Sequence, residues 1–265
     1  MLSDKIKEIV ENRKKTLELE KIQLIDFDIN IQNLNRISLS ANIKKNNGIS
    51  IISEIKPSSP SLGEIRSNIN IKNTAMQMEE AGAIGLSILT EPNYFNGNYK
   101  NLQIAVENTE IPCLMKDFVI DELQLRIAYQ LGATNILLIN SIVDIIEFYS
   151  LAQKYGLEPL IEIHKIEEID DLIKLFDLGF KPKLVGVNNR NLKTLDIDLD
   201  NSNKIIPILK EEFGEQIIVI SESGIHTHED ITHLLLSGAD AFLIGSSIMK
   251  SNNIKQKILE LRGVV

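Results

Sequence analysis

Ser53-Glu54-Ile55-Lys56-Pro57-Ser58-Ser59-Pro60-Ser61 is a stretch in which an apolar strand gives way to a polar loop. The preceding residues 49–52 form an apolar, β-branched run that predicts a buried strand. Glu54 and Lys56 are two residues apart, so in a strand both side chains point to the same face. Two prolines then end the strand. Because charged groups are rarely buried without a partner or a purpose, this pattern indicates either the mouth of an active site or a strand end with a surface ion pair.

From this stretch onward, strand-like and helix-like segments alternate. We expect strands at 49–56, 83–89, 112–117, 135–139, 159–164, 184–188, 217–221 and 241–244, and helices at 72–81, 100–108, 121–131, 143–155, 167–178, 203–212, 228–237 and 254–261. Alternation with apolar strands predicts a parallel sheet covered by helices. Eight units in about 220 residues predict an α/β fold of the (β/α)8 TIM barrel type. The alternative is an open, doubly wound sheet, which would need a glycine-rich first turn that is missing here.

Residues 1–47 precede the first strand and are helical in pattern. Apolar side chains at Ile6, Ile9, Val10 and Leu17 form a partial stripe at helical spacing, and a second helix is predicted at 33–44. We therefore expect one domain over 1–265, in which 1–47 is an N-terminal helical extension and 48–265 is the barrel.

Composition excludes several classes of protein. The 265 residues carry a formal net charge of -9, which argues against nucleic-acid binding but not against an anionic substrate. One cysteine, Cys113, fits a reducing compartment. The N-terminus has no secretory signal and no apolar run has the length of a membrane span. We expect a cytoplasmic protein without nucleic-acid or membrane partners.

Polar side chains gather at the expected carboxyl ends of the strands, where barrels of this type place catalytic groups. They are Glu54, Lys56, Lys116, Glu162, Asn188 and Glu222. Counting with a period of two points each into the barrel, whereas Cys113 has the opposite parity and should pack under a helix. Three carboxylates and two lysines close together should shift each other's pKa values, as active sites require. His164 lies beyond Glu162 on the same face, so we expect it to play a supporting part.

The last two strands are each followed by a loop with glycine and serine. The loops are Ser221-Glu222-Ser223-Gly224-Ile225 and Ile244-Gly245-Ser246-Ser247. In such barrels these loops and a short following helix commonly bind phosphate, which predicts an anion site; a plain helix N-cap is the alternative. Arg190 is either an anion contact or a solvated loop charge. Thr227 to Asp230 predict a capping box, and the nearby histidines lack a metal spacing.

Five ordered segments together resemble the indole-3-glycerol-phosphate synthase family of tryptophan biosynthesis. They are Glu54-Ile55-Lys56-Pro57-Ser58-Ser59-Pro60-Ser61, Leu114-Met115-Lys116-Asp117-Phe118, Leu160-Ile161-Glu162-Ile163-His164, Gly186-Val187-Asn188-Asn189-Arg190-Asn191-Leu192 and Ser221-Glu222-Ser223-Gly224-Ile225. Leu89-Thr90-Glu91 with Phe95 and Gly97 adds to the match, which covers nearly the whole chain. Pro57 and Asn98 depart from the family pattern, and neither is a catalytic position.

The resemblance implies a carbon–carbon lyase that closes an indole ring on 1-(2-carboxyphenylamino)-1-deoxyribulose 5-phosphate and releases CO₂ and water. It implies Lys116 as general acid, and Glu54 and Glu162 as an acid–base pair with Lys56 as second acid or anchor. The residues implied for binding are Asn188, Glu222 and Ser223 for substrate hydroxyls, and Gly224, Gly245 and Ser246 for phosphate, with Ser59 and Arg190 nearby.

The resemblance also implies that the apolar extension covers the substrate ring, and that no metal or organic cofactor is needed. We expect a monomer, with a weak dimer as the alternative. Three other functions stay open on the residues alone. They are a Schiff-base aldolase with Lys116 or Lys56 as nucleophile, a phosphosugar isomerase, and a non-catalytic phosphate-binding barrel.

Overall fold

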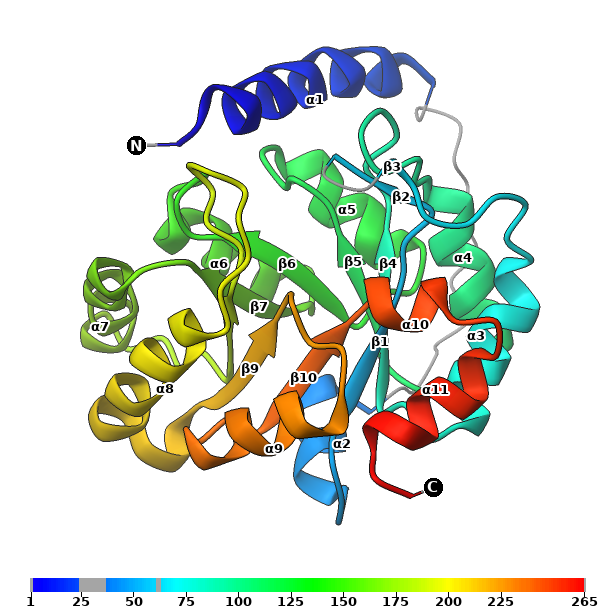
Figure 1. Cartoon of the computed structure of the whole chain (residues 1–265). Helices are drawn as coiled ribbons and strands as arrows, with labels where there is room; N and C mark the ends of the chain where they lie inside the picture. The colour runs from blue at the N-terminus through cyan, green and yellow to red at the C-terminus, as the bar shows by residue number, and fades with distance from the viewer. Residues whose placement is uncertain (1, 24–36, 61–62, 265) are drawn as a thin grey trace.

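Eight parallel strands close into a barrel in the computed structural model, which describes residues 2–23, 37–60 and 63–264 (Figure 1). The barrel strands are β1 (Ile51–Ile55), β4 (Gly85–Leu89), β5 (Cys113–Lys116), β6 (Asn135–Ile139), β7 (Glu158–Ile163), β8 (Leu184–Asn188), β9 (Ile218–Glu222) and β10 (Ala241–Ile244). Each strand pairs with its neighbours in sequence, and β1 pairs with β10 to close the ring. The predicted (β/α)8 fold is therefore confirmed.

Helices follow the strands and surround the barrel (Figure 1). They are α3 (Ile71–Glu80), α4 (Tyr99–Asn108), α5 (Glu122–Gln130), α6 (Ile145–Lys154), α7 (Ile169–Asp177), α8 (Asp200–Phe213), α9 (His228–Leu236), α10 (Ser246–Lys250) and α11 (Ile254–Leu261), with 3-10 turns η2 (Ile166–Glu168) and η3 (Gly214–Gln216). Every strand and helix predicted from residue 49 onward is present, with ends displaced by up to three residues. The largest displacement is at α8, which begins at Asp200 rather than at 203 because Ser202 is buried against Asn189 and Ser221. The second helix predicted in the extension, 33–44, is wrong at positions 37 and 38, because Ser38 is the N-cap of a helix that begins at Leu39.

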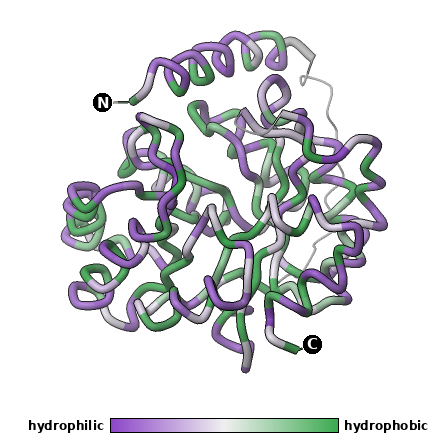
Figure 2. Tube along the Cα trace, in the orientation of Figure 1, coloured by the Kyte–Doolittle hydropathy of each residue, from purple (hydrophilic) through white to green (hydrophobic). Residues whose placement is uncertain are grey.

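The core has two layers, because successive side chains of a strand point to opposite faces. Ile52, Leu114 and Leu160 belong to the cluster inside the barrel. Their strand neighbours Met115 and Ile161 belong to the outer cluster, where strands meet helices. Cys113 packs in that outer cluster, as its parity predicted. Along the chain, the strands are mostly apolar, whereas the helices contain both apolar and polar residues (Figure 2).

The N-terminal extension supplies a helix to each end of the barrel. α1 (Asp4–Gln23) lies across one end and α2 (Leu39–Lys45) lies at the other (Figure 1). Leu39 of α2 joins the inner cluster, and the backbone N–H of Ser40 donates to Glu158 at the start of β7, so α2 closes the amino-terminal end. Positions 33–36 of the predicted second helix lie outside the described residues. Within the described ranges, no helix is long and apolar enough to cross a membrane.

Candidate active site

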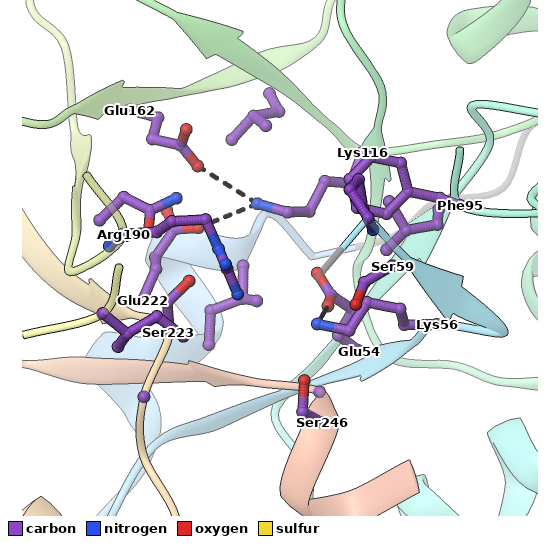
Figure 3. Close-up of a pocket in the computed structure, with 18 of the residues that line it drawn as sticks. Glu54, Lys56, Ser59, Phe95, Lys116, Glu162, Arg190, Glu222, Ser223 and Ser246 are labelled. Carbon is purple, nitrogen blue, oxygen red and sulfur yellow. Dashed lines mark hydrogen bonds and ion pairs between the residues drawn. The ribbon is translucent and has the colours of Figure 1, made fainter. Parts of the chain in front are cut away.

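A cavity of about 250 Å³ opens at the carboxyl ends of the strands, beneath α1. All the site residues expected from the sequence line this one cavity. They are Glu54, Lys56, Ser59, Lys116, Glu162, Asn188, Arg190, Glu222, Ser223, Gly224, Gly245 and Ser246. Most of them are drawn in Figure 3. They come from β1, β5, β7, β8 and β9, from the segments that follow β1, β8, β9 and β10, and from the first residue of α10, so the barrel gathers residues that are up to 192 positions apart in the chain.

Lys116 lies at the centre of the charged groups. Its Nζ donates to Glu162 Oε2 at 3.2 Å and to Glu222 Oε2 at 3.0 Å (Figure 3). Burial opposes the charge on Lys116, but Glu222, Glu162 and Glu54 outweigh that effect and raise its pKa above the ordinary lysine value. Lys116 is therefore an ammonium at neutral pH.

The pKa values of the two carboxyl groups beside Lys116 are shifted in opposite directions. Burial raises the pKa of Glu222 to about 8, and although Lys116 opposes this shift, the neighbouring Glu162 adds to it. At Glu162 burial acts in the same direction, but Lys116, His164 and Asn188 prevail and lower the pKa of that carboxyl below its usual range. Two acids in contact with one cation thus favour opposite protonation states, an arrangement typical of acid–base catalysis.

Glycine backbones make room for two of the buried carboxylates. A Cβ on Gly186 would lie 2.1 Å from Glu222 Oε1, and one on Gly245 would lie 2.4 Å from Glu54 Oε1. Glu222 Oε1 is buried without a hydrogen-bond partner among the described residues, so this oxygen lacks a group that would stabilise a negative charge. The pattern of residues along the strands does not by itself predict these close approaches.

Glu54 and Lys56 form an ion pair across the cavity from Lys116. Lys56 Nζ lies 2.9 Å from Glu54 Oε1, and both side chains face the interior (Figure 3). Glu54 is 2% exposed, which decides against the alternative of a surface ion pair at the end of β1. The strand end has thus placed a charged pair inside the barrel, where a carboxylate needs a cation.

The loops after β8 and β9 interlock at the side of the cavity near Ser223. Asn189 Nδ2 donates to the Ser223 carbonyl at 3.0 Å, and Ser223 and Gly224 have φ values of 70° and 84°. This left-handed backbone is unusual for serine and is held by that bond. Arg190 donates to the Leu195 carbonyl at 2.9 Å; burial lowers the Arg190 pKa, and the field of Glu54 and Glu162 partly restores it. Arg190 is thus a half-buried cation facing carboxylates rather than a solvated loop charge.

The remaining wall is apolar and includes α1. Its side chains are Ile6, Ile9, Leu89, Phe95, Phe118, Leu137, Ile139, Leu192, Leu195, Ile197, Ile225, Leu243 and Ile244. Ile6 and Ile9 show that the extension does cover the cavity. Sequence reasoning did not single out Lys5, Glu91, Asp117, His226 and Lys250, which also line it. Of these, Glu91 and Asp117 follow strand ends and carried a usable signal, while Lys5 is placed only by helix docking.

Histidine contributes one contact at the edge of the site. His164 Nε2 lies 3.2 Å from Glu162 Oε1, consistent with the supporting part expected for it. Thr227 and Asp230 form the predicted capping box at the start of α9. Across residues 2–23, 37–60 and 63–264, no group of three or more His, Cys, Asp or Glu side chains is arranged to hold a metal ion.

The fold and the cavity together define a class: a (β/α)8-barrel protein with a buried acid–base site under an N-terminal helix. The family model for indole-3-glycerol phosphate synthase matches residues 3–261. The chain belongs to the indole-3-glycerol phosphate synthase family. The predicted family is thereby confirmed.

Named relatives agree with this assignment, and a solved structure shares the fold. An indole-3-glycerol phosphate synthase of Methanocaldococcus jannaschii is 46% identical over 96% of this chain and 97% of its own length. One from Koribacter versatilis is 42% identical over 79% of this chain and 78% of its own. A thiamine phosphate pyrophosphorylase from Pyrococcus furiosus covers 86% of this chain and 97% of its own, with a TM-score of 0.60 at 15% identity, a likeness of fold alone.

Proposed function

We propose that Lys116, Glu162 and Lys56 carry the central proton transfers of indole-3-glycerol phosphate synthesis, and that Glu222 holds Lys116 and a substrate hydroxyl. The activity of the chain is that of its family, a decarboxylating carbon–carbon lyase. It closes, decarboxylates and dehydrates 1-(2-carboxyphenylamino)-1-deoxyribulose 5-phosphate to indole-3-glycerol phosphate, CO₂ and water. The observation that carries the proposal is the ammonium of Lys116 held between two buried carboxyl groups, whose surroundings shift their pKa values in opposite directions.

Ring closure requires an acid. The ring carbon that bears the carboxylate attacks the ribulose carbonyl, a carbon–carbon bond forms, and the carbonyl oxygen takes up a proton. Lys116 is charged, buried and aimed into the cavity, so it can donate that proton and stabilise the developing oxyanion. A Schiff-base role would need a neutral amine, which the surrounding carboxylates disfavour.

Decarboxylation restores the ring, after which a hydroxyl must leave as water and a proton must be removed. Glu162, held ionised, is placed to accept that proton. Lys56 and Glu54 form a second charged pair on the facing wall, from which Lys56 can protonate the leaving hydroxyl. Because acid and base come from different strands, the substrate lies between them.

Binding is assigned to the loops and to α1. Asn188, Glu222 and Ser223, which line the cavity, hold substrate hydroxyls. The phosphate lies at the backbone of Gly224, Gly245 and Ser246, where left-handed and glycine backbone permits close approach. Two further side chains are assigned to the phosphate end of the substrate. Arg190 supplies a positive charge there and Ser59 supplies a hydroxyl. The apolar wall with Ile6 and Ile9 takes the ring.

At the level of the whole chain, we propose one folding unit over 1–265. The extension, 1–47, supplies helices at both ends of the barrel 48–265. The residues that line the cavity all belong to the described part of one chain, which supports a monomer acting on a small-molecule substrate. We also propose that the protein acts in the cytoplasm.

Replacing Lys116 by methionine tests the mechanism. Lys116→Met keeps the length of the side chain and removes the proton, so kcat should fall by ~10²–10⁴-fold or more while KM changes little. Product formation is followed by indole fluorescence, which is clean because the chain contains no tryptophan. The matched control is Lys154→Met, because Lys154 is exposed on α6 and remote from the cavity.

Borohydride trapping separates the lyase from a Schiff-base aldolase. The wild-type protein treated with substrate and borohydride should keep its mass. A stable adduct on Lys116, or a Lys116→Met variant with near-normal kcat, would contradict the mechanism proposed here.

A further inference from the structure

Arg13 of α1 is a fully buried cation outside the set of proton-transfer residues. Its side chain is 0% exposed. Nε and Nη2 donate to the two oxygens of Asp117 at 2.9 and 3.0 Å, and Nη1 donates to Glu20 at 2.9 Å. Nη2 also donates to the Tyr99 hydroxyl at 2.5 Å. Burial opposes this charge, yet Asp117, Tyr99 and Glu20 raise the pKa of Arg13, so it is permanently cationic.

Attachment of α1 to the barrel does not by itself account for a buried ion pair. Removing two charges from water is costly, and well-packed apolar residues of similar volume often stabilise as much. α1 already has such residues, since Ile6, Ile9 and Leu17 are buried. It is also tied at its polar face, where Asn93 donates to Thr16 and Tyr94 donates to Glu8. A charge at Arg13 therefore calls for a reason beyond docking.

The reason lies in the partner of Arg13. Asp117 directly follows Lys116 and lines the cavity on the side of Phe118 and Glu91. Burial raises the pKa of Glu91, backbone N–H groups of residues 93 and 94 oppose that shift, and Asp117 raises it further. Asp117 is therefore close enough to this wall to act on a charge there. Without Arg13, the fully buried Asp117 carboxylate beside the wall would keep, among the described residues, the Thr90 hydroxyl as its side-chain partner.

We propose that Arg13 is a positioning residue that neutralises Asp117, so that the ring-side wall accepts the carboxylate of the substrate. This inference rests on the proposed function, because it is the carboxyphenylamino end of the substrate that meets α1. Two like charges brought together in a low-dielectric cavity repel strongly, and a bidentate guanidinium on Asp117 removes that repulsion before the substrate binds. The same contacts fix α1, so that Ile9 stays over the cavity.

The test compares two ligands rather than turnover. The first is the substrate with its ribulose carbonyl reduced to an alcohol, and the second is the same compound without the ring carboxylate. In calorimetric titrations, Arg13→Met should weaken the first ligand about tenfold and the second less than about threefold. In the Arg13→Met/Asp117→Asn double variant the first ligand should recover to within about threefold of wild type, since Glu20 is partly exposed and screened.

A purely structural role of Arg13 gives different results. Equal weakening of both ligands by Arg13→Met, or a further loss on adding Asp117→Asn, would overturn the proposal. If Arg13→Met does not fold, Asp117→Asn alone decides, because it should leave the first ligand as tightly bound as in wild type, whereas a docking role predicts that both ligands weaken. Failure of wild-type protein to bind either ligand would instead refute the proposed function.

Discussion

The position of the Glu222 side chain depends on the absence of a side chain at Gly186. The side chain is 1% exposed, and its Oε1 occupies space that any side chain on Gly186 would fill. Gly186 has an ordinary strand conformation, so the glycine is needed to leave room for Glu222 and not to form a turn. The proposed protonated state of Glu222 is thus maintained by a packing detail on the adjacent strand β8.

Gly186→Ala should therefore impair catalysis. The added Cβ would lie 2.1 Å from Glu222 Oε1, and the displaced carboxyl would lose its contact with Lys116. A misplacement of about 1 Å can cost on the order of 10² in rate, so we expect a fall of that size in kcat, measured by indole fluorescence. Gly48→Ala is the control, since nothing lies within 4 Å of its Cβ position and its φ is not positive. Unchanged kcat in Gly186→Ala would remove Glu222 from the mechanism.

At the scale of elements, the extension consists of two helices with separate tasks. α1 carries Ile6 and Ile9 into the cavity wall, whereas α2 fills the opposite end with Leu39 and binds Glu158 through Ser40. Both helices belong to the stretch 1–47, so a single truncation at 47 would confound substrate binding with barrel stability.

Deletion of residues 1–23 isolates the task of α1. The ring pocket would lose the side chains of Ile6 and Ile9, and Asp117 would lose the paired cation Arg13. KM should therefore rise at least about tenfold while the barrel stays folded. Circular dichroism and urea unfolding check the fold, and Leu39→Ala is the comparison. That change should cost about 2–5 kcal/mol of unfolding free energy with little effect on KM, because Leu39 is buried in the barrel core. Normal KM after the deletion would show that α1 does not bind the ring.

At the scale of the whole molecule, the buried carboxyl of Glu222 should make stability depend on pH. Its folded-state pKa, about 8, lies above the unfolded value near 4.5. A raised pKa means that the native state binds the proton more tightly. The stabilisation is therefore complete below about pH 4.5 and is lost as pH rises towards 8.

This linkage is measured by urea unfolding of wild type and Glu222→Gln between pH 5 and 8. As pH rises, the unfolding free energy of wild type should fall relative to that of Glu222→Gln by up to about 1.4 kcal/mol per pH unit. Glu162 has the opposite sign, since its lowered pKa makes its contribution vanish only as pH falls below about 4.5. A difference that is flat across this window would show that Glu222 is already ionised at pH 5.

Local patterns determined the sequence of elements. Apolar β-branched runs, amphipathic stretches and glycine turns depend on neighbours in the chain, so all eight strands and their helices could be predicted, with ends displaced by a few residues. Period-two counting also brought Glu54, Lys116, Glu162 and Glu222 to one face, because a strand of a parallel barrel has a fixed inside. Twelve site positions, named from the strand ends, from the glycine loops and from the family resemblance, line one cavity.

Tertiary structure decided what these residues do to one another. Only the closed barrel brings Lys116 between Glu162 and Glu222. There burial raises the pKa of Glu222, while Lys116, His164 and Asn188 lower that of Glu162, because the pKa depends on distance and desolvation rather than on spacing in the chain. The same holds for Gly186 beside Glu222 and for Arg13, 104 positions from Asp117. A helical pattern fixes which face of α1 is apolar, but the barrel end against which it packs determines whether its buried arginine meets a carboxylate.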